Sequence, residues 1–164
     1  MSGGHRFGRW QRVRHVAFLG IVGAVALAGP ASAAGADSDV TKGAFHAFAA
    51  GAAEGMHIHG DAVMIRTPAN RTVVVVIVMG LAPNTTYGAH VHKQACANGD
   101  ADGHYKFDSA GPVDSVNEIW PGFTTNPSGI GIGFAQNVGI AGSSAVSVVI
   151  HAPGGAKIAC ADLK

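Results

Sequence analysis

Short runs of apolar and β-branched residues recur along the chain and are separated by turn residues. The clearest run covers residues 72–79, and its centre, Val73-Val74-Val75-Val76-Ile77-Val78, predicts a strand buried on both faces or nearly so. Pro68-Ala69-Asn70 before it predicts a hairpin turn, and residues 80–84 after it predict another turn. Shorter runs predict six further strands, at residues 63–66, 86–92, 119–124, 130–136, 145–151 and 157–161.

Several short strands at this spacing predict an all-β sandwich or barrel. One stretch rich in glycine, aspartate and alanine, residues 96–112, interrupts the strands as a long loop. Loops of this length in compact domains are usually functional or disordered. Residues 34–54 are rich in alanine and glycine, so we expect a flexible N-terminal segment there, strands that start late, and a folded domain at residues 55–164.

The first 33 residues have the pattern of a secretory signal peptide. An apolar run of about 13 residues, 16–28, follows four arginines and is shorter than the ~20 residues of a membrane-spanning helix. Ala31-Ser32-Ala33 then fits the small-x-small cleavage pattern. We expect cleavage after Ala33 and a secreted protein, extracellular, periplasmic or in the cell envelope, without a stable membrane anchor. An uncleaved anchor is the alternative.

The charge of the remaining chain excludes one class of partner. Residues 34–164 carry seven lysines and arginines against ten acidic residues, a formal charge of −3, and the basic residues form no cluster. A nucleic-acid partner is therefore not expected.

Cys96 and Cys160 are the only cysteines. In an exported chain an oxidising compartment favours joining them, and closing a 64-residue loop would contribute on the order of 4 kcal/mol. Free buried thiols are the alternative. A two-cysteine zinc site is less favoured, because neither cysteine has a second one two to four residues away.

Four histidines have positions that suit one metal ion. His90 and His92 flank Val91 in a predicted strand, so both imidazoles project to the same face. His151 ends another predicted strand, and a Cys96–Cys160 bond would tie the two segments together at one end of the fold. His104 in the long loop could supply a fourth nitrogen. Three or four nitrogen ligands in a tetragonal arrangement suit copper(II) best, whereas separately placed surface histidines are the alternative.

His57 and His59 form a second His-x-His pair. It could be an accessory copper-loading site, but no third ligand is placed near it and His46 is only a speculative one. Ordinary surface histidines are the favoured interpretation.

The order His-Val-His, cysteine, Gly-His-Tyr, Val-Val-Ile-His and Ile-Ala-Cys over residues 81–163 resembles the copper/zinc superoxide dismutase family. This resemblance implies a Greek-key, immunoglobulin-like β-sandwich or flattened barrel of about eight strands. It also implies three copper ligands, one ligand that bridges copper to zinc, and one intrachain disulfide: His90, His92 and His151; His104; and Cys96–Cys160.

The chain departs from the family at the zinc site and at the guiding arginine. No histidine lies between His104 and His151, and Asp108 and Asp114 cannot make a nitrogen-rich zinc site by themselves. Only five residues separate His151 from Lys157, which takes the place of the arginine. The chain is therefore similar to the copper-only branch of the family, with copper as its cofactor and zinc not expected.

The resemblance implies a secreted, copper-dependent enzyme that converts superoxide to oxygen and hydrogen peroxide by redox cycling of copper. Lys157 would attract the superoxide anion, and His104, on a loop, would be the ligand that dissociates. Glu118 is the candidate that orients the His104 imidazole, with a solvent-facing glutamate as the alternative. A secreted copper-binding or storage protein with little or no turnover is the second function, and an envelope domain without metal is a third.

Overall fold

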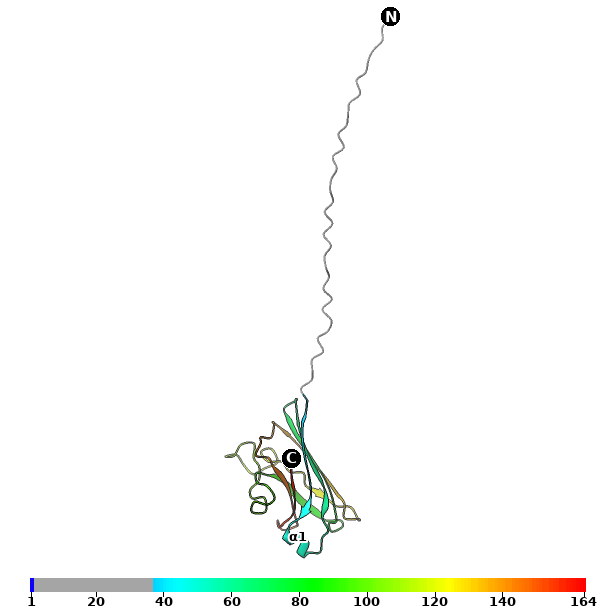
Figure 1. Ribbon diagram of the computed structural model, residues 1–164, viewed down its shortest axis with the longest axis vertical. Coiled ribbons are helices and arrows are strands. Elements are labelled where there is room, and N and C mark those ends of the chain that lie inside the picture. The colour runs from blue at the N-terminus through cyan, green and yellow to red at the C-terminus, as the bar shows by residue number, and fades with distance from the viewer. Residues whose placement is uncertain (2–36) are drawn as a thin grey trace. The chain divides into compact units, whose positions relative to one another are not determined.

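The structure, a computed structural model, describes Met1 and residues 37–164, so the predicted signal peptide lies, Met1 apart, outside the described residues. A single compact unit spans Gly35–Lys164. Nearly all of its regular structure is strand, with α1 at one end (Figure 1). The elements in chain order are β1 (Asp39–Ala44), β2 (His46–Ala47), α1 (Ala49–Ala53), β3 (His59–Thr67), β4 (Arg71–Met79), β5 (Thr86–His92), β6 (Phe123–Thr124), β7 (Gly131–Val138), β8 (Ser147–His151) and β9 (Lys157–Asp162).

The strands form two antiparallel sheets, which confirms the predicted all-β sandwich. Sheet A has the order β1-β3-β4-β7, and sheet B has the order β2-β9-β8-β5-β6. After β4 the chain crosses to β5 in sheet B, and β7 later returns to lie beside β4; β8 likewise lies beside β5. Such returns to a non-consecutive neighbour give the Greek-key connectivity. The described part of the chain has nine strands where about eight were expected.

The core lies between the two sheets and is built by alternation along each strand. In β4, Val74, Val76 and Val78 are fully buried and pack in one cluster with Val91 of β5 and Val148 of β8. The other side of β4 points outward. The prediction that this strand is buried on both faces or nearly so is wrong, because no element of the described chain covers the outer side of sheet A, and Ile77 is 45% exposed there.

Most predicted strands are present at the predicted places, but one is not. The strand expected at residues 119–124 shrinks to the two residues of β6. Asp114 holds the preceding segment in a turn, where its side chain accepts hydrogen bonds from the N–H groups of Val116 and Asn117, at 3.0 and 2.8 Å. Pro121 then lacks an N–H group to donate to a neighbouring strand.

The expectation of a flexible segment at residues 34–54 is wrong from Asp39 onward. β1 pairs with β3 over its whole length, from Asp39 opposite Arg66 to Ala44 opposite Asp61. The chain after β1 is fixed by Phe45 and Phe48, whose side chains are buried. β1 is an edge strand held chiefly by backbone hydrogen bonds, and the buried Phe45 and Phe48 come only after it. Its sequence therefore has little apolar periodicity, and the alanine and glycine content of residues 34–54 wrongly suggested flexibility.

The long loop predicted at residues 96–112 is present, and it begins and ends beyond those bounds, because no named strand lies between β5 and β6. The Cys96–Cys160 disulfide is confirmed and joins this loop to β9, with 5.8 Å between the two Cα atoms. An intrachain disulfide indicates an oxidising, extracellular-type compartment. Within the described residues, no helix has both the length and the apolar character needed to cross a membrane.

Candidate metal centre

Sheet B brings the predicted histidines together. In the β5–β8 pairing, Gly88 lies opposite His151 and His90 lies opposite Val149, so the end of β8 sits beside the β5 histidines. His92 is buried, and a single bridge of backbone hydrogen bonds joins it to His104. Val91, which lies between His90 and His92 in β5, points to the other side of the strand, into the core.

The four imidazoles converge on one point. Their ligand nitrogens all lie within 4.8 Å of one another, in the group His90, His92, His104 and His151. The ring centroids of His90 and His104 are 4.2 Å apart, and those of His90 and His151 are 4.8 Å apart. The alternative of separate surface histidines is therefore wrong: this cluster could hold a metal ion.

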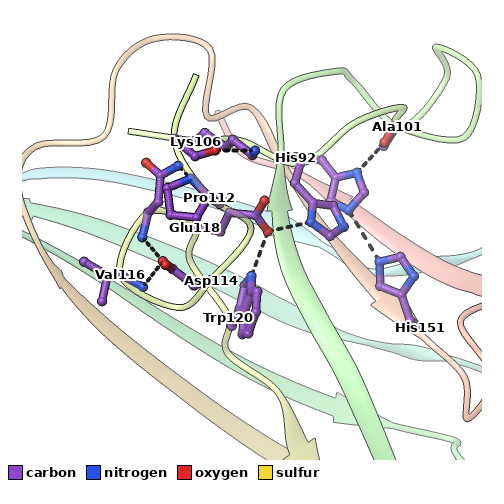
Figure 2. Close-up of polar contacts among 12 residues, drawn as sticks. His92, Ala101, Lys106, Pro112, Asp114, Val116, Glu118, Trp120 and His151 are labelled. Carbon is purple, nitrogen blue, oxygen red and sulfur yellow. Dashed lines mark hydrogen bonds and ion pairs between the residues drawn. The ribbon is translucent and has the colours of Figure 1, made fainter. Parts of the chain in front are cut away.

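Hydrogen bonds to one nitrogen of each ring orient three of the four imidazoles. Nδ1 of His92 bonds the Ala101 carbonyl (Figure 2), Nδ1 of His151 bonds the Gly155 carbonyl at 3.1 Å, and Nδ1 of His104 bonds a Glu118 carboxylate oxygen at 2.6 Å. Carbonyl and carboxylate oxygens only accept, so each Nδ1 carries the proton and each Nε2 keeps a free lone pair. This is the second layer of contacts that metal-binding histidines usually have.

The remaining nitrogens fit a cation. Nε2 of His92 and Nε2 of His151 face each other at 3.4 Å (Figure 2), and two bare lone pairs repel at that distance unless a cation lies between them. In addition, Nδ1 of His90 is buried and has no hydrogen-bond partner. A metal ion bound by Nδ1 of His90 and Nε2 of the other three rings would satisfy all four atoms.

The surroundings keep these imidazoles neutral. Burial lowers the pKa of His90 to about 4 and the pKa of His92 to about 3, and it also lowers the pKa of His151. Positive charge on the neighbouring His104 acts in the same direction on all three. Near pH 7 these three rings are therefore uncharged, which is the form that binds a metal ion without first losing a proton.

Glu118 contacts His104 at Nδ1, the ring nitrogen that does not face the proposed metal position. Its side chain is 1% exposed, so the solvent-facing alternative is wrong, and the residue itself lies in the loop between β5 and β6. The same oxygen that bonds His104 also accepts a hydrogen bond from the Trp120 indole N–H, at 2.9 Å (Figure 2). Trp120 is not predicted from the sequence, and its place two residues after Glu118 is the only signal for it there.

A left-handed stretch of loop backbone supplies two acceptors at the cluster. Gly99, Asp100 and Ala101 have φ values of 58°, 52° and 52°. The Ala101 carbonyl bonds His92, and the preceding Asp100 carbonyl accepts a hydrogen bond of 2.9 Å from the Lys157 ammonium. Lys157 is paired with His151 in the β8–β9 register, which places this lysine beside the cluster. Its charge also lowers the pKa of His92 and of His151.

Other candidate ligands lie apart from the cluster. The side chain of His59 bonds the His57 carbonyl at 2.8 Å, and neither residue joins a group of three metal-ligating side chains within residues 37–164. His46 is exposed. The carboxylates of Asp108 and Asp114 accept hydrogen bonds from nearby N–H groups of their own loop.

No protein-family model and no curated protein sequence matches this chain.

Proposed function

We propose that the four-histidine cluster binds copper. Its donors are four imidazole nitrogens, with no carboxylate or thiolate among them, and such a set suits copper. His90 would bind through Nδ1, which is buried without a hydrogen-bond partner. His92, His104 and His151 would bind through Nε2, because Nδ1 of each of these rings is already bonded to a carbonyl or carboxylate oxygen. The resemblance to the copper-only superoxide dismutases supports the same choice.

We further propose that the protein is a secreted superoxide dismutase. Bound copper would supply one-electron chemistry, in which one superoxide is oxidised to oxygen and a second, with two protons, is reduced to hydrogen peroxide. The observation that carries the proposal is a lysine ammonium beside the converged imidazoles, since a metal with an anion-attracting group suits an anionic substrate. The disulfide supports export to an oxidising compartment, with residues 1–33 as the signal.

Lys157 would attract the substrate. Its ammonium donates to a neutral carbonyl, that of Asp100, and among the described residues it forms no ion pair with an acidic side chain. Two further lysines, Lys93 and Lys106, line a cavity of about 520 Å³ on the Glu118 side of His104 and add positive charge near the site. A lysine is a point charge without the planar fork of arginine, so it would hold a diatomic anion less strictly.

His104 would be the ligand that takes up and releases a proton, at Nε2. Its backbone is held to β5 on both sides, because Lys93 donates its N–H to the Gly103 carbonyl at 3.0 Å and Tyr105 donates its N–H to the Val91 carbonyl at 2.8 Å. Movement of this ligand is therefore assigned to the ring. Glu118 keeps the Nδ1 proton in place while Nε2 changes its partner.

A copper-storage protein is the second function, favoured by one observation. The Lys157 ammonium is already bonded to the Asp100 carbonyl, and a tethered point charge would guide an anion poorly. Storage needs the four imidazoles and no guiding charge.

Copper content and turnover of the same preparation test the proposal. Purified protein should bind about one copper per chain and should accelerate superoxide decay in a stopped-flow assay. His92→Ala should lose both properties, whereas His59→Ala, a change at an exposed histidine, should lose neither. Copper without turnover would assign the storage function. An equimolar zinc that resists dialysis would contradict the copper assignment, and the absence of any bound metal would leave a structural domain.

A further inference from the structure

The outward face of sheet A is apolar where a solvent-facing sheet usually alternates to polar residues. In the register of the four strands, Lys42, Val63, Val75 and Phe134 lie side by side across the sheet. The row below contains Ala44, Asp61, Ile77 and Ile132, and the row above contains Val40, Ile65, Val73 and Gln136. Nine of these twelve positions are apolar. We call this surface the outer apolar face.

The side chains at the β7 side of this face are well exposed. Ile132 is 67% exposed and Phe134 is 61% exposed, and each lies opposite an apolar residue of β4, Ile77 and Val75. Single exposed apolar residues are normal on protein surfaces. A continuous set that runs across four strands is not, and it marks an interaction surface.

The outer side of sheet A, with the outer apolar face at its centre, has the size of a protein interface. β3 and β4 have nine residues each, or ~30 Å at ~3.3 Å per residue, and four strands ~4.8 Å apart span ~19 Å. The flat footprint of the whole outer side of the sheet is therefore ~500–600 Å². The three rows of the outer apolar face, ~6.6 Å apart, take up the central ~380 Å² of it, within the range of the largest apolar patches found on monomers. A stable pair needs at least ~500 Å² from each partner.

We propose that two copies of the chain associate through this face, outer apolar face against outer apolar face. The charged side chains in the three central rows are one lysine and one aspartate, Lys42 and Asp61, so a self-contact does not place a surface of a single charge against itself. A two-fold pair also makes each copy cover the other with the same apolar area, and it closes without leaving a second face open.

This arrangement leaves the metal cluster accessible. The core separates the two sheets, and the histidines of β5 alternate with Val91, which points into that core, so they lie on the outer side of sheet B. Association through sheet A therefore occurs on the opposite side of the sandwich. The inference does not depend on which metal the cluster binds or on what it does.

Sedimentation equilibrium of the purified chain from ~1 to ~100 µM tests the pairing. The wild type should have twice the mass of one chain at the upper end. Ile132→Lys and Phe134→Lys should each raise the dissociation constant about 30-fold or more, because each places a charge in an apolar contact. Both side chains point to solvent in the single chain, so the core and the copper content should not change.

Val116→Lys is the matched control, because Val116 is 79% exposed on a loop of the same chain and lies outside sheet A; it should pair like the wild type. A wild type that remains a single chain at ~100 µM would overturn the inference. Unchanged pairing in both lysine variants would also overturn it. Flotation of single chains with phosphatidylglycerol vesicles, lost in Ile132→Lys, would assign the face to a lipid surface instead.

Discussion

Replacing Glu118 by glutamine tests how the candidate metal centre holds its loop ligand. Glutamine has almost the same shape as glutamate, and its amide oxygen can still accept hydrogen bonds from the His104 ring and the Trp120 indole. Its amide nitrogen would replace the second carboxylate oxygen, which is buried and has no partner in the structure. The substitution therefore removes the negative charge with little change in packing.

The size of the effect follows from the contacts of that charge. The carboxylate accepts bonds of 2.6 Å from His104 and 2.9 Å from Trp120, at a site where Glu118 is 1% exposed. Hydrogen bonds to a charged group contribute ~1.5–3 kcal/mol, against ~0.5–1.5 kcal/mol for neutral pairs. Loss of such a partner of a ligand typically weakens metal binding ~10- to 100-fold, or ~1.4–2.8 kcal/mol, and we expect that range here.

Competition with a chromophoric chelator at fixed pH measures the copper affinity of each variant. Trp120→Phe removes a donor to the carboxylate but keeps the charge, so its effect should be smaller than that of Glu118→Gln. Glu54→Gln removes an exposed carboxylate and should leave the affinity unchanged. Equal copper affinities for Glu118→Gln and the wild type would refute the reasoning, since the buried charge would then contribute nothing to the ligand it contacts.

Three further predictions concern the guiding charge, the disulfide and pH. Lys157→Glu should slow superoxide turnover strongly with copper still bound, whereas Lys157→Arg should retain or raise the rate. Both effects should shrink as the screening length falls from ~10 Å at 0.1 M salt to ~3 Å at 1 M. Lys164→Glu is the control, and equal turnover rates for the wild type and the two Lys157 variants at low salt would exclude guidance. Cys160→Ser should lower the free energy of unfolding by ~2–5 kcal/mol in urea titrations, and an unchanged midpoint would contradict the assigned pairing. Copper-free protein should lose stability as pH falls from 6.5 toward about 3, because His90 and His92 take up protons in the unfolded chain but stay neutral in the folded one. The urea midpoint should therefore fall with pH over this range, and His90→Gln should make that fall smaller.

The strands and the histidine cluster could be predicted from the sequence because their signals are local. The two-residue period of a strand puts His90 and His92 on one face, and two cysteines in an exported chain have one way to pair within it. The disulfide and the β5–β8 pairing then bring His151 to the same place. The face shared by His90 and His92 and the cysteine pairing used only side-chain identity and spacing, whereas the β5–β8 pairing is seen in the structure.

Other features depend on contacts that leave no such signal. β1 is held by backbone hydrogen bonds to β3, and its six residues include only one valine and one threonine among charged and small residues, so its sequence gave little indication of a strand. The run of valines in β4 shows a strand but not which of its faces lacks a covering layer, since a buried strand and a strand with an apolar outer face read alike. The Ala101 acceptor of His92 is a carbonyl, and every residue has one.

The backbone of residues 99–101 sets how this part of the chain can vary in evolution or in design. Its two contacts, to His92 and to Lys157, come from main-chain oxygens in a conformation that glycine, asparagine and aspartate tolerate better than β-branched residues do. Exposed side chains here can therefore change with little consequence, as long as the left-handed geometry is kept. Adding or deleting one residue between Cys96 and His104 would turn both oxygens away from their partners. This segment is constrained in its length and in its left-handed backbone more than in the chemistry of its side chains, and we expect active variants to differ here by substitution and not by insertion.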